Sequence, residues 1–262
     1  DGSCGRDGRM GLADLPGASQ SLHIAEARFG LVGAASLGLP PPGSGRSAFT
    51  VVSFDADTGV RAEVAQGLEP AHFVDRSGRL YLVPFGPRGV VAGGSGLVWV
   101  GDGATEEIRA FSPDGGEVAR VLLDIDRRPV DGGDVERLRN AYVDRLSEDV
   151  ARQQLTLLRS MALPKEFPTV DQIKVDRQGN LWVQPWEPFW AEGPQRWLVF
   201  DQSGQHLADV EVPEAALPAC SRRVLAGCSS LSGILEIGMD YMLVSSPDDL
   251  GTPRVVKFRL QR

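Results

Sequence analysis

The chain has 262 residues, which is enough to bury a substantial core in one large domain or in two ordinary ones. No apolar run approaches the roughly 20 residues that a membrane helix needs, and a net charge of -8 disfavours phosphate backbones and anionic lipid as partners. We therefore expect neither a transmembrane segment nor nucleic-acid binding. The 31 glycines and 18 prolines exceed average usage, which favours a turn-rich β protein.

The N-terminal region gives the weakest pattern. Residues 22–32 fit a strand pair, and a loop rich in Gly, Pro and Ser follows at 37–46. The first clear hairpin comes next, with strands at 49–54 and 60–64. Apolar and polar residues alternate in its second strand, so we expect one face of this hairpin to be buried.

One five-residue pattern recurs along the chain: an aromatic or aliphatic residue, then Asp or Ser, two variable positions and a glycine. It occupies residues 74–78, 111–115, 175–179 and 200–204, with a version one residue longer at 54–59. Asp or Ser can accept a hydrogen bond from the backbone two residues on, and glycine supplies the positive φ of a tight turn. Each copy therefore predicts a turn between two antiparallel strands.

Strand-like segments flank these turns in groups of four. Two such groups cover residues 89–123 and 170–212, with Trp99 and Trp182 at equivalent positions in their second strands. Four short strands in about 35 residues is the size of one propeller blade. A third group at 234–260 has three strands, and we expect the N-terminal region to supply the fourth. The pattern predicts an all-β fold, a β-propeller that forms a single domain over residues 1–262.

A helical insertion is expected at residues 134–162, between the two clearest blades. Its apolar residues recur every three or four positions with charges between them, which is typical of an amphipathic helix or helix pair. These apolar positions are Val135, Leu138, Tyr142, Leu146 and Val150. Asp134 fits the N-cap and Pro164 ends the run. The apolar stripe is expected to lie on the edge or top of the propeller.

Several segments resemble the exported bacterial six-bladed β-propeller proteins related to NHL-repeat propellers. The similarity lies at residues 84–94, 100–103 and 107–109, in the helical insertion with 163–170, at 173–183, and at 237–244 with 256–260. The resemblance implies six blades and a periplasmic or extracellular location. Members of that family are usually longer at the N-terminus and carry an export signal, so a first blade is expected to be missing or degraded here.

The strongest binding character lies in the Pro-rich segment 182–197, which holds four of the five tryptophans. Trp182 and Trp197 fit strand positions and are expected in the core. Trp186, Phe189 and Trp190 depart from strand alternation, and with Arg196 they form our candidate site for a protein, carbohydrate or small-molecule ligand. On this basis we expect a non-catalytic binding or scaffold protein without a cofactor, acting as a monomer.

A metal-dependent hydrolase or lyase is the alternative function. Lactonases and esterases on the six-bladed fold hold a cation such as calcium in the central tunnel through acidic and amide side chains, and Asp171, Gln172 and Glu236 are the candidates. The acidic turn residues at 55–59 and 124–134 lack the full spacing of a calcium loop, and turn formation explains them better. Serine catalysis is disfavoured because the chain contains no Gly-x-Ser-x-Gly.

Three cysteines leave an odd count. Cys220 and Cys228 stand eight positions apart around a short polar loop, so a disulfide between them is geometrically easy and would indicate an oxidising compartment. Two unpaired buried thiols would give the same pattern. Cys4 has no remaining partner, and without a Cys-x-x-Cys motif a thiolate metal site is not expected.

Overall fold

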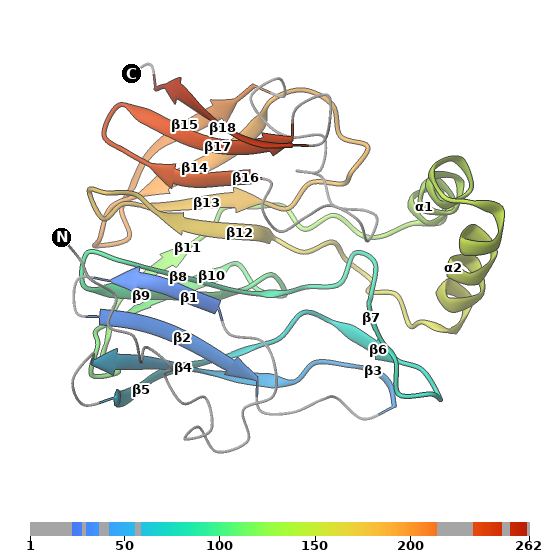
Figure 1. Ribbon diagram of the computed structural model, residues 1–262, viewed down its shortest axis with the longest axis horizontal. Coiled ribbons are helices and arrows are strands. Elements are labelled where there is room, and N and C mark those ends of the chain that lie inside the picture. The colour runs from blue at the N-terminus through green and yellow to red at the C-terminus, as the bar shows by residue number, and fades with distance from the viewer. Residues whose placement is uncertain are drawn as a thin grey trace.

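A computed structural model of the chain describes residues 23–27, 30–36, 42–55, 59–213, 233–247 and 252–260. Antiparallel sheets make up most of this part of the molecule, and one pair of helices projects from the end of the sheets (Figure 1). The prediction of an all-β protein with a helical insertion is therefore confirmed. No helix in the described part of the chain combines the length and hydrophobicity that a membrane span requires.

Four sheets follow one another in chain order, and we number them first to fourth. The first contains β1 (His23–Ala27), β2 (Gly30–Ser36), β4 (Ala48–Asp55) and β5 (Gly59–Leu68). The second contains β8 (Gly89–Gly94), β9 (Leu97–Asp102), β10 (Glu107–Phe111) and β11 (Glu117–Leu122). The third contains β12 (Val170–Val175), β13 (Leu181–Pro185), β14 (Gln195–Phe200) and β15 (His206–Val212). The fourth contains β16 (Gly233–Ile237), β17 (Tyr241–Pro247) and β18 (Pro253–Arg259).

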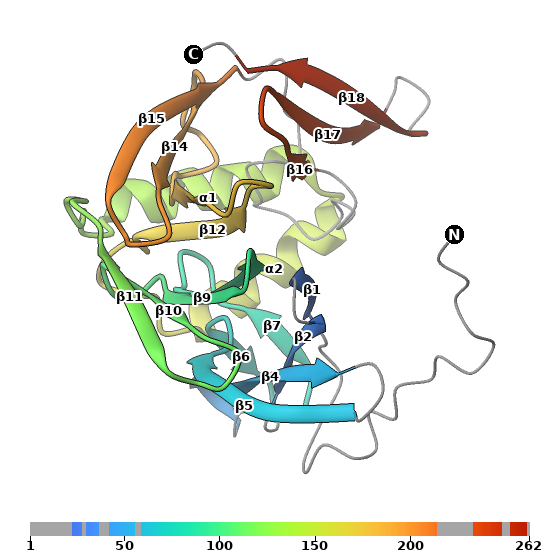
Figure 2. The same ribbon diagram turned by 90° about the vertical axis from the view of Figure 1, so that its left-hand side faces the viewer.

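These sheets are arranged as an open arc. Figure 2 shows β5, β11, β15 and β18 on its outside, while β8 contacts both β1 and β12 on the inside. In the described residues the sheets do not close into a ring. A separate small sheet joins β3 (Gly43–Gly45), β6 (His72–Val74) and β7 (Leu80–Leu82).

The N-terminal strands correct one expectation. β1 pairs with β2, and β2 pairs with β4, so residues 23–36 belong to the first sheet. They do not supply a fourth strand to the group formed by β16, β17 and β18, and that prediction was wrong for these residues. The pairing of β2 with β4 could not be predicted, because sequence periodicity identifies strands but not their partners.

The recurring turn pattern forms the expected turns. Asp176 accepts hydrogen bonds from the backbone N–H groups of Gln178 (2.8 Å) and Asn180 (2.9 Å), and Asp75 and Asp201 make the same pair of contacts in their turns. The closing glycines all have φ between +82° and +89°. The turn conformation of the longer version at 54–59 is not tested, because its residues 56–58 lie outside the described part of the chain.

Apolar side chains between successive sheets form the core. Val51, Val64 and Phe111 pack between the first and second sheets, and Trp99 packs with Leu181 between the second and third. Another cluster lies between the third and fourth sheets and contains both Trp182 and Trp197, whose burial is as expected.

The insertion forms two helices, α1 (Gly132–Arg145) and α2 (Glu148–Ser160). Asp131, rather than Asp134, is the N-cap of α1: its side chain accepts from the N–H of Asp134, whose own carboxylate accepts from the N–H of Asp131. By sequence, either Asp suits an N-cap. The helix begins earlier than expected because the two Gly residues between Asp131 and Asp134 also adopt helical geometry.

The two ends of the insertion are tied to each other. The N–H of Val130 donates to the carbonyl of Lys165, and the N–H of Phe167 donates to that of Arg128, each at 2.9 Å. The helices therefore stand on a narrow base formed by two adjacent backbone segments. Of the apolar stripe, Leu138 and Tyr142 are buried, whereas Val150 is exposed.

Candidate binding groove

The aromatic loop after β13 packs against the helix pair. Trp186 stacks on Phe167 with ring centroids 4.5 Å apart, and Phe85 lies edge-on to both Trp186 and Trp190. Leu138, Tyr142 and Leu158 from the helices belong to the same cluster. Trp186, Phe189 and Trp190 are all half-buried, so they form the seat on which the helices rest. Whether they also contact a ligand stays a prediction.

Arg196 lies apart from this cluster. It projects from β14 and pairs with Asp209 on the neighbouring β15, with its Nη2 atom 2.7 Å from the carboxylate. His206 contacts the other oxygen of the same carboxylate at 2.8 Å. The structure therefore joins three of the four candidate binding residues and leaves Arg196 in an exposed ion pair on the sheet.

The three candidate metal ligands do not converge. Asp171 pairs with Arg88 at 3.3 Å at the start of β12, and Gln172 donates to Gln184. Glu236 pairs with Arg177 at 3.0 Å, just past the other end of β12. At about 3.3 Å per residue, these two ends are on the order of 15–20 Å apart. In the described ranges, no three His, Cys, Asp or Glu side chains gather as a metal site would require.

Glu236 is held in its ionised form by its neighbours. The hydroxyl of Tyr241 donates to it, and this bond together with the nearby Arg177 lowers the pKa of the carboxyl group. The same hydrogen bond raises the pKa of Tyr241. Glu236, Arg177 and Tyr241 therefore form a polar cluster on the surface.

Cys4, Cys220 and Cys228 lie outside the described residues, and the proposed disulfide stays a prediction.

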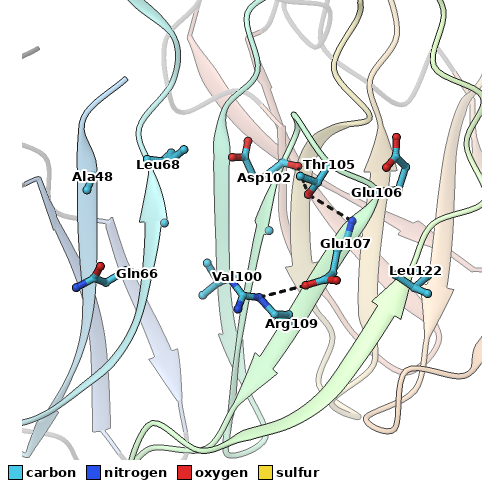
Figure 3. A pocket seen from close by; sticks show the side chains of 12 residues that line it. Ala48, Gln66, Leu68, Val100, Asp102, Thr105, Glu106, Glu107, Arg109 and Leu122 are labelled. Atoms are coloured by element: carbon cyan, nitrogen blue, oxygen red, sulfur yellow. Dashed lines mark hydrogen bonds and ion pairs between the residues drawn. The ribbon is translucent and has the colours of Figure 1, made fainter. Parts of the chain in front are cut away.

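A groove of about 570 Å³ lies between the first and second sheets (Figure 3). Residues from five strands and one loop line it: Ala48 on β4; Gln66, Gly67 and Leu68 on β5; Val100, Gly101 and Asp102 on β9; Thr105 and Glu106 in the following loop; Glu107 and Arg109 on β10; and Leu122 on β11. The groove is open to solvent.

Two exposed leucines lie at opposite sides of this groove. Figure 3 places Leu68 and Leu122 on opposite sides, with Val100, Glu107 and Arg109 between them. Leu122 is 72% exposed and Leu68 is 39% exposed, whereas Val100 is buried and continues into the core between the sheets. The groove therefore offers apolar surface on both walls, next to polar groups.

Carboxylates outnumber guanidinium groups among the lining residues. Asp102 is paired at 2.8 Å with Arg46, and Glu107 contacts Arg120 at 3.1 Å and Arg109 at 3.4 Å. Glu106 has a longer contact, 3.4 Å, to Arg127, and its side chain is 41% exposed. An arriving cation would therefore find Glu106 the most available of the three acids.

Sequence reasoning missed this groove. Its residues come from segments up to 74 positions apart, from Ala48 to Leu122, and none of them was a candidate site residue. One indication of an exposed leucine was present in the sequence. Leu122 follows Val121 in a strand, so the two side chains point to opposite faces of the sheet. Pattern alone could not tell that the outward face borders another sheet.

Neither a scan against models of known protein families nor a search of curated proteins finds a match for this chain.

Proposed function

We propose that this protein is a non-catalytic binding or scaffold module and that the groove between the first and second sheets is its ligand site. The observation that carries this proposal is the pair of exposed leucines on opposite walls of one groove. Single exposed apolar side chains are common on protein surfaces, but apolar groups that line a concavity together with polar groups are typical of binding sites. A ligand seated there would cover both leucines.

A tunnel-metal hydrolase has less support. Its three candidate ligands, Asp171, Gln172 and Glu236, have other partners and lie at different places along β12 and β16. Bringing Asp171 and Glu236 onto one cation would require breaking two arginine ion pairs and moving the strands. A binding function requires no such rearrangement of these side chains.

The proposal includes a fold and a location. We infer that the four sheets are blades of a β-propeller with six blades, because they repeat one antiparallel topology and follow one another with the first strand inward. Resemblance to exported propellers and the spacing of Cys220 and Cys228 support a place in the cell envelope, periplasmic or extracellular. We propose that the protein acts there as a monomer.

The first test is a thermal-shift screen of cations, neutral sugars and short peptides against three proteins: the natural sequence, Leu122→Ser and Leu207→Ser. Leu207 is a matched control, because it is 52% exposed on β15 and does not line the groove. We expect a compound that raises the Tm of the natural protein by about 2–4 °C, equivalent to about 1 kcal/mol of added stability. Leu122→Ser should lose this shift and Leu207→Ser should keep it.

Metal analysis of protein purified without chelator completes the test. Stoichiometric calcium or zinc, together with ester or lactone hydrolysis that chelation abolishes, would replace the binding proposal with the enzyme. A stabilising compound whose effect survives in Leu122→Ser would move the site away from the groove.

A further inference from the structure

We propose that the groove binds an extended peptide, which adds as a strand to the edge of β5 and carries a basic side chain two positions from an apolar one. This inference rests on the proposed function and names the ligand class of the same site. Three independent features support it: the direction of backbone groups on β5, the chemistry of the side chains that line the groove, and the excess of carboxylates among them.

Some backbone groups of β5 point away from β4, toward the groove side of the strand. The N–H of Glu69 donates to the carbonyl of Ser47, which makes Ala48 and Leu68 a non-hydrogen-bonded pair in the antiparallel ladder. Since such pairs alternate, the N–H and C=O groups of Gln66 and Leu68 both point away from β4. Arg46 already uses one of them, because its Nη2 atom donates to the carbonyl of Leu68 at 3.2 Å.

This edge borders the groove. β5 is the last strand of the first sheet, and no strand of the described residues pairs with its outer side. Figure 3 shows Leu68 on β5 between Ala48 of β4 and Asp102 of β9. An extended segment in the groove could therefore form backbone hydrogen bonds with Gln66 and with the N–H of Leu68, as in other cases of strand addition.

Side-chain chemistry favours a peptide over an oligosaccharide. None of the twelve described residues that line the groove is aromatic. Sugar rings are bound in large part by aromatic faces, which supply flat apolar area with polar edges. Leu68, Leu122 and Val100 instead offer aliphatic surface, which suits a leucine-like side chain that projects from an extended backbone.

Charge selects a basic residue in addition to the apolar one. Three acids, Asp102, Glu106 and Glu107, line the groove with one lining cation, Arg109, and each acid also has an arginine partner outside the lining. Successive side chains of an extended peptide point to opposite sides, so residues two apart share a side. A Lys or Arg two positions from the apolar residue shares its side of the peptide and can approach Glu106, whose contact to Arg127 is the loosest of the three acid pairs.

The test uses an array of acetylated, amidated heptapeptides whose three central positions carry every combination of Leu, Ser, Lys and Glu. Fluorescently labelled protein should bind the sequences that place Lys two positions from Leu, and replacement of Lys by Glu should abolish the signal. Solution titration of the best peptide should then give a Kd that rises about tenfold in Leu122→Ser and in Glu106→Gln. The matched controls Leu207→Ser and Glu211→Gln, on β15, should bind like the natural protein.

Backbone pairing is tested separately with the same peptide methylated at its central amide nitrogens. Methylation removes the donors that strand addition needs and leaves the side chains in place, so we expect binding to be lost. Equal binding of the methylated peptide would overturn strand addition, and binding that survives in both groove variants would overturn the site.

A parallel array of neutral oligosaccharides distinguishes failure of this inference from failure of the proposed function. Sugar binding that depends on Leu122, without any peptide signal, would overturn the peptide inference and retain the groove as a ligand site. Absence of groove-dependent binding on both arrays would overturn both.

Discussion

Gly204 satisfies two requirements of the turn between β14 and β15. Its φ is +89°, which favours glycine, and a Cβ atom there would lie 2.6 Å from the carbonyl oxygen of Arg120 on β11. Gly115 does the same one sheet earlier, where a Cβ atom would lie 3.0 Å from the carbonyl oxygen of Glu63 on β5. Each of these turns therefore rests on the outermost strand of the preceding sheet, and glycine permits both the turn and the contact.

Gly204→Ala should lower the free energy of unfolding more than Gly78→Ala does. Gly78 has φ +82° and open space where its Cβ would be, so alanine there meets only the cost of the left-handed conformation, about 1 kcal/mol. At Gly204 the clash with the β11 backbone adds to this cost, and we expect a total of about 2–3 kcal/mol. Urea unfolding of both variants measures the difference, and equal losses would show that the contact between sheets contributes nothing.

The helix pair is attached through one buried carboxylate. Asp134 is fully buried, and both its oxygens accept hydrogen bonds from Arg128 at 3.0 Å. Burial alone would raise the pKa of Asp134, but the hydrogen bonds from Arg128 and from the N–H of Asp131 outweigh it and lower the pKa. Arg128 in turn lies over the ring of Phe167, 4.2 Å from its centroid. Cap, ion pair and aromatic seat thus meet at the start of α1.

Removing that carboxylate should loosen the helices and leave the sheets intact. Asp134→Ala removes the acceptor for the N–H of Asp131, which is one half of the capping box, and leaves Arg128 without its partner, so we expect a local loss of about 2–3 kcal/mol. Amide hydrogen exchange should accelerate across residues 132–160 and stay unchanged in β8–β15. Asp149→Ala, in the exposed first turn of α2, is the control and should change little. Equal acceleration in the sheets would mean that helices and sheets unfold as one unit.

Across the whole molecule, ionisable groups favour folding near neutral pH. Within the part of the chain that the structure describes, the pKa is lowered for five carboxyl groups: Asp75, Asp134, Asp201, Asp209 and Glu236. In the turns, hydrogen bonds from the hydroxyls of Ser77 and Ser203 are the largest causes for Asp75 and Asp201. Burial, and then the charge of Arg46, lowers the pKa of His72.

Acid should therefore destabilise the protein. Each group with a lowered pKa binds fewer protons when folded than when unfolded, so its stabilisation is lost as pH falls. The decline should begin below about pH 6.5 through His72 and steepen below about pH 5 through the carboxyls. Urea midpoints at a series of pH values from neutral to acidic would show it. A midpoint that rises on acidification would contradict the shifts in pKa.

Local features of this molecule could be predicted from the sequence, and contacts between distant segments could not. Asp176 and Gly179 specify their turn through their own backbone geometry, so pattern was sufficient there. The burial of Trp186 depends on the segment that covers it, and the sequence does not show that α1 packs on that loop. Leu122 likewise lines a groove only because β5 lies across from it. Burial and partners at such positions depend on the arrangement of whole sheets.

The narrow base of the helix pair has an evolutionary consequence. Because residues 128–130 and 165–167 are already joined by backbone hydrogen bonds, the segment between them can be gained or lost in one genetic event without separating the ends of β11 and β12. Loss would, however, uncover Phe85, Trp186 and Trp190. The aromatic loop and the helices are therefore expected to be inherited together, and lineages that lack one should have replaced the other with polar residues.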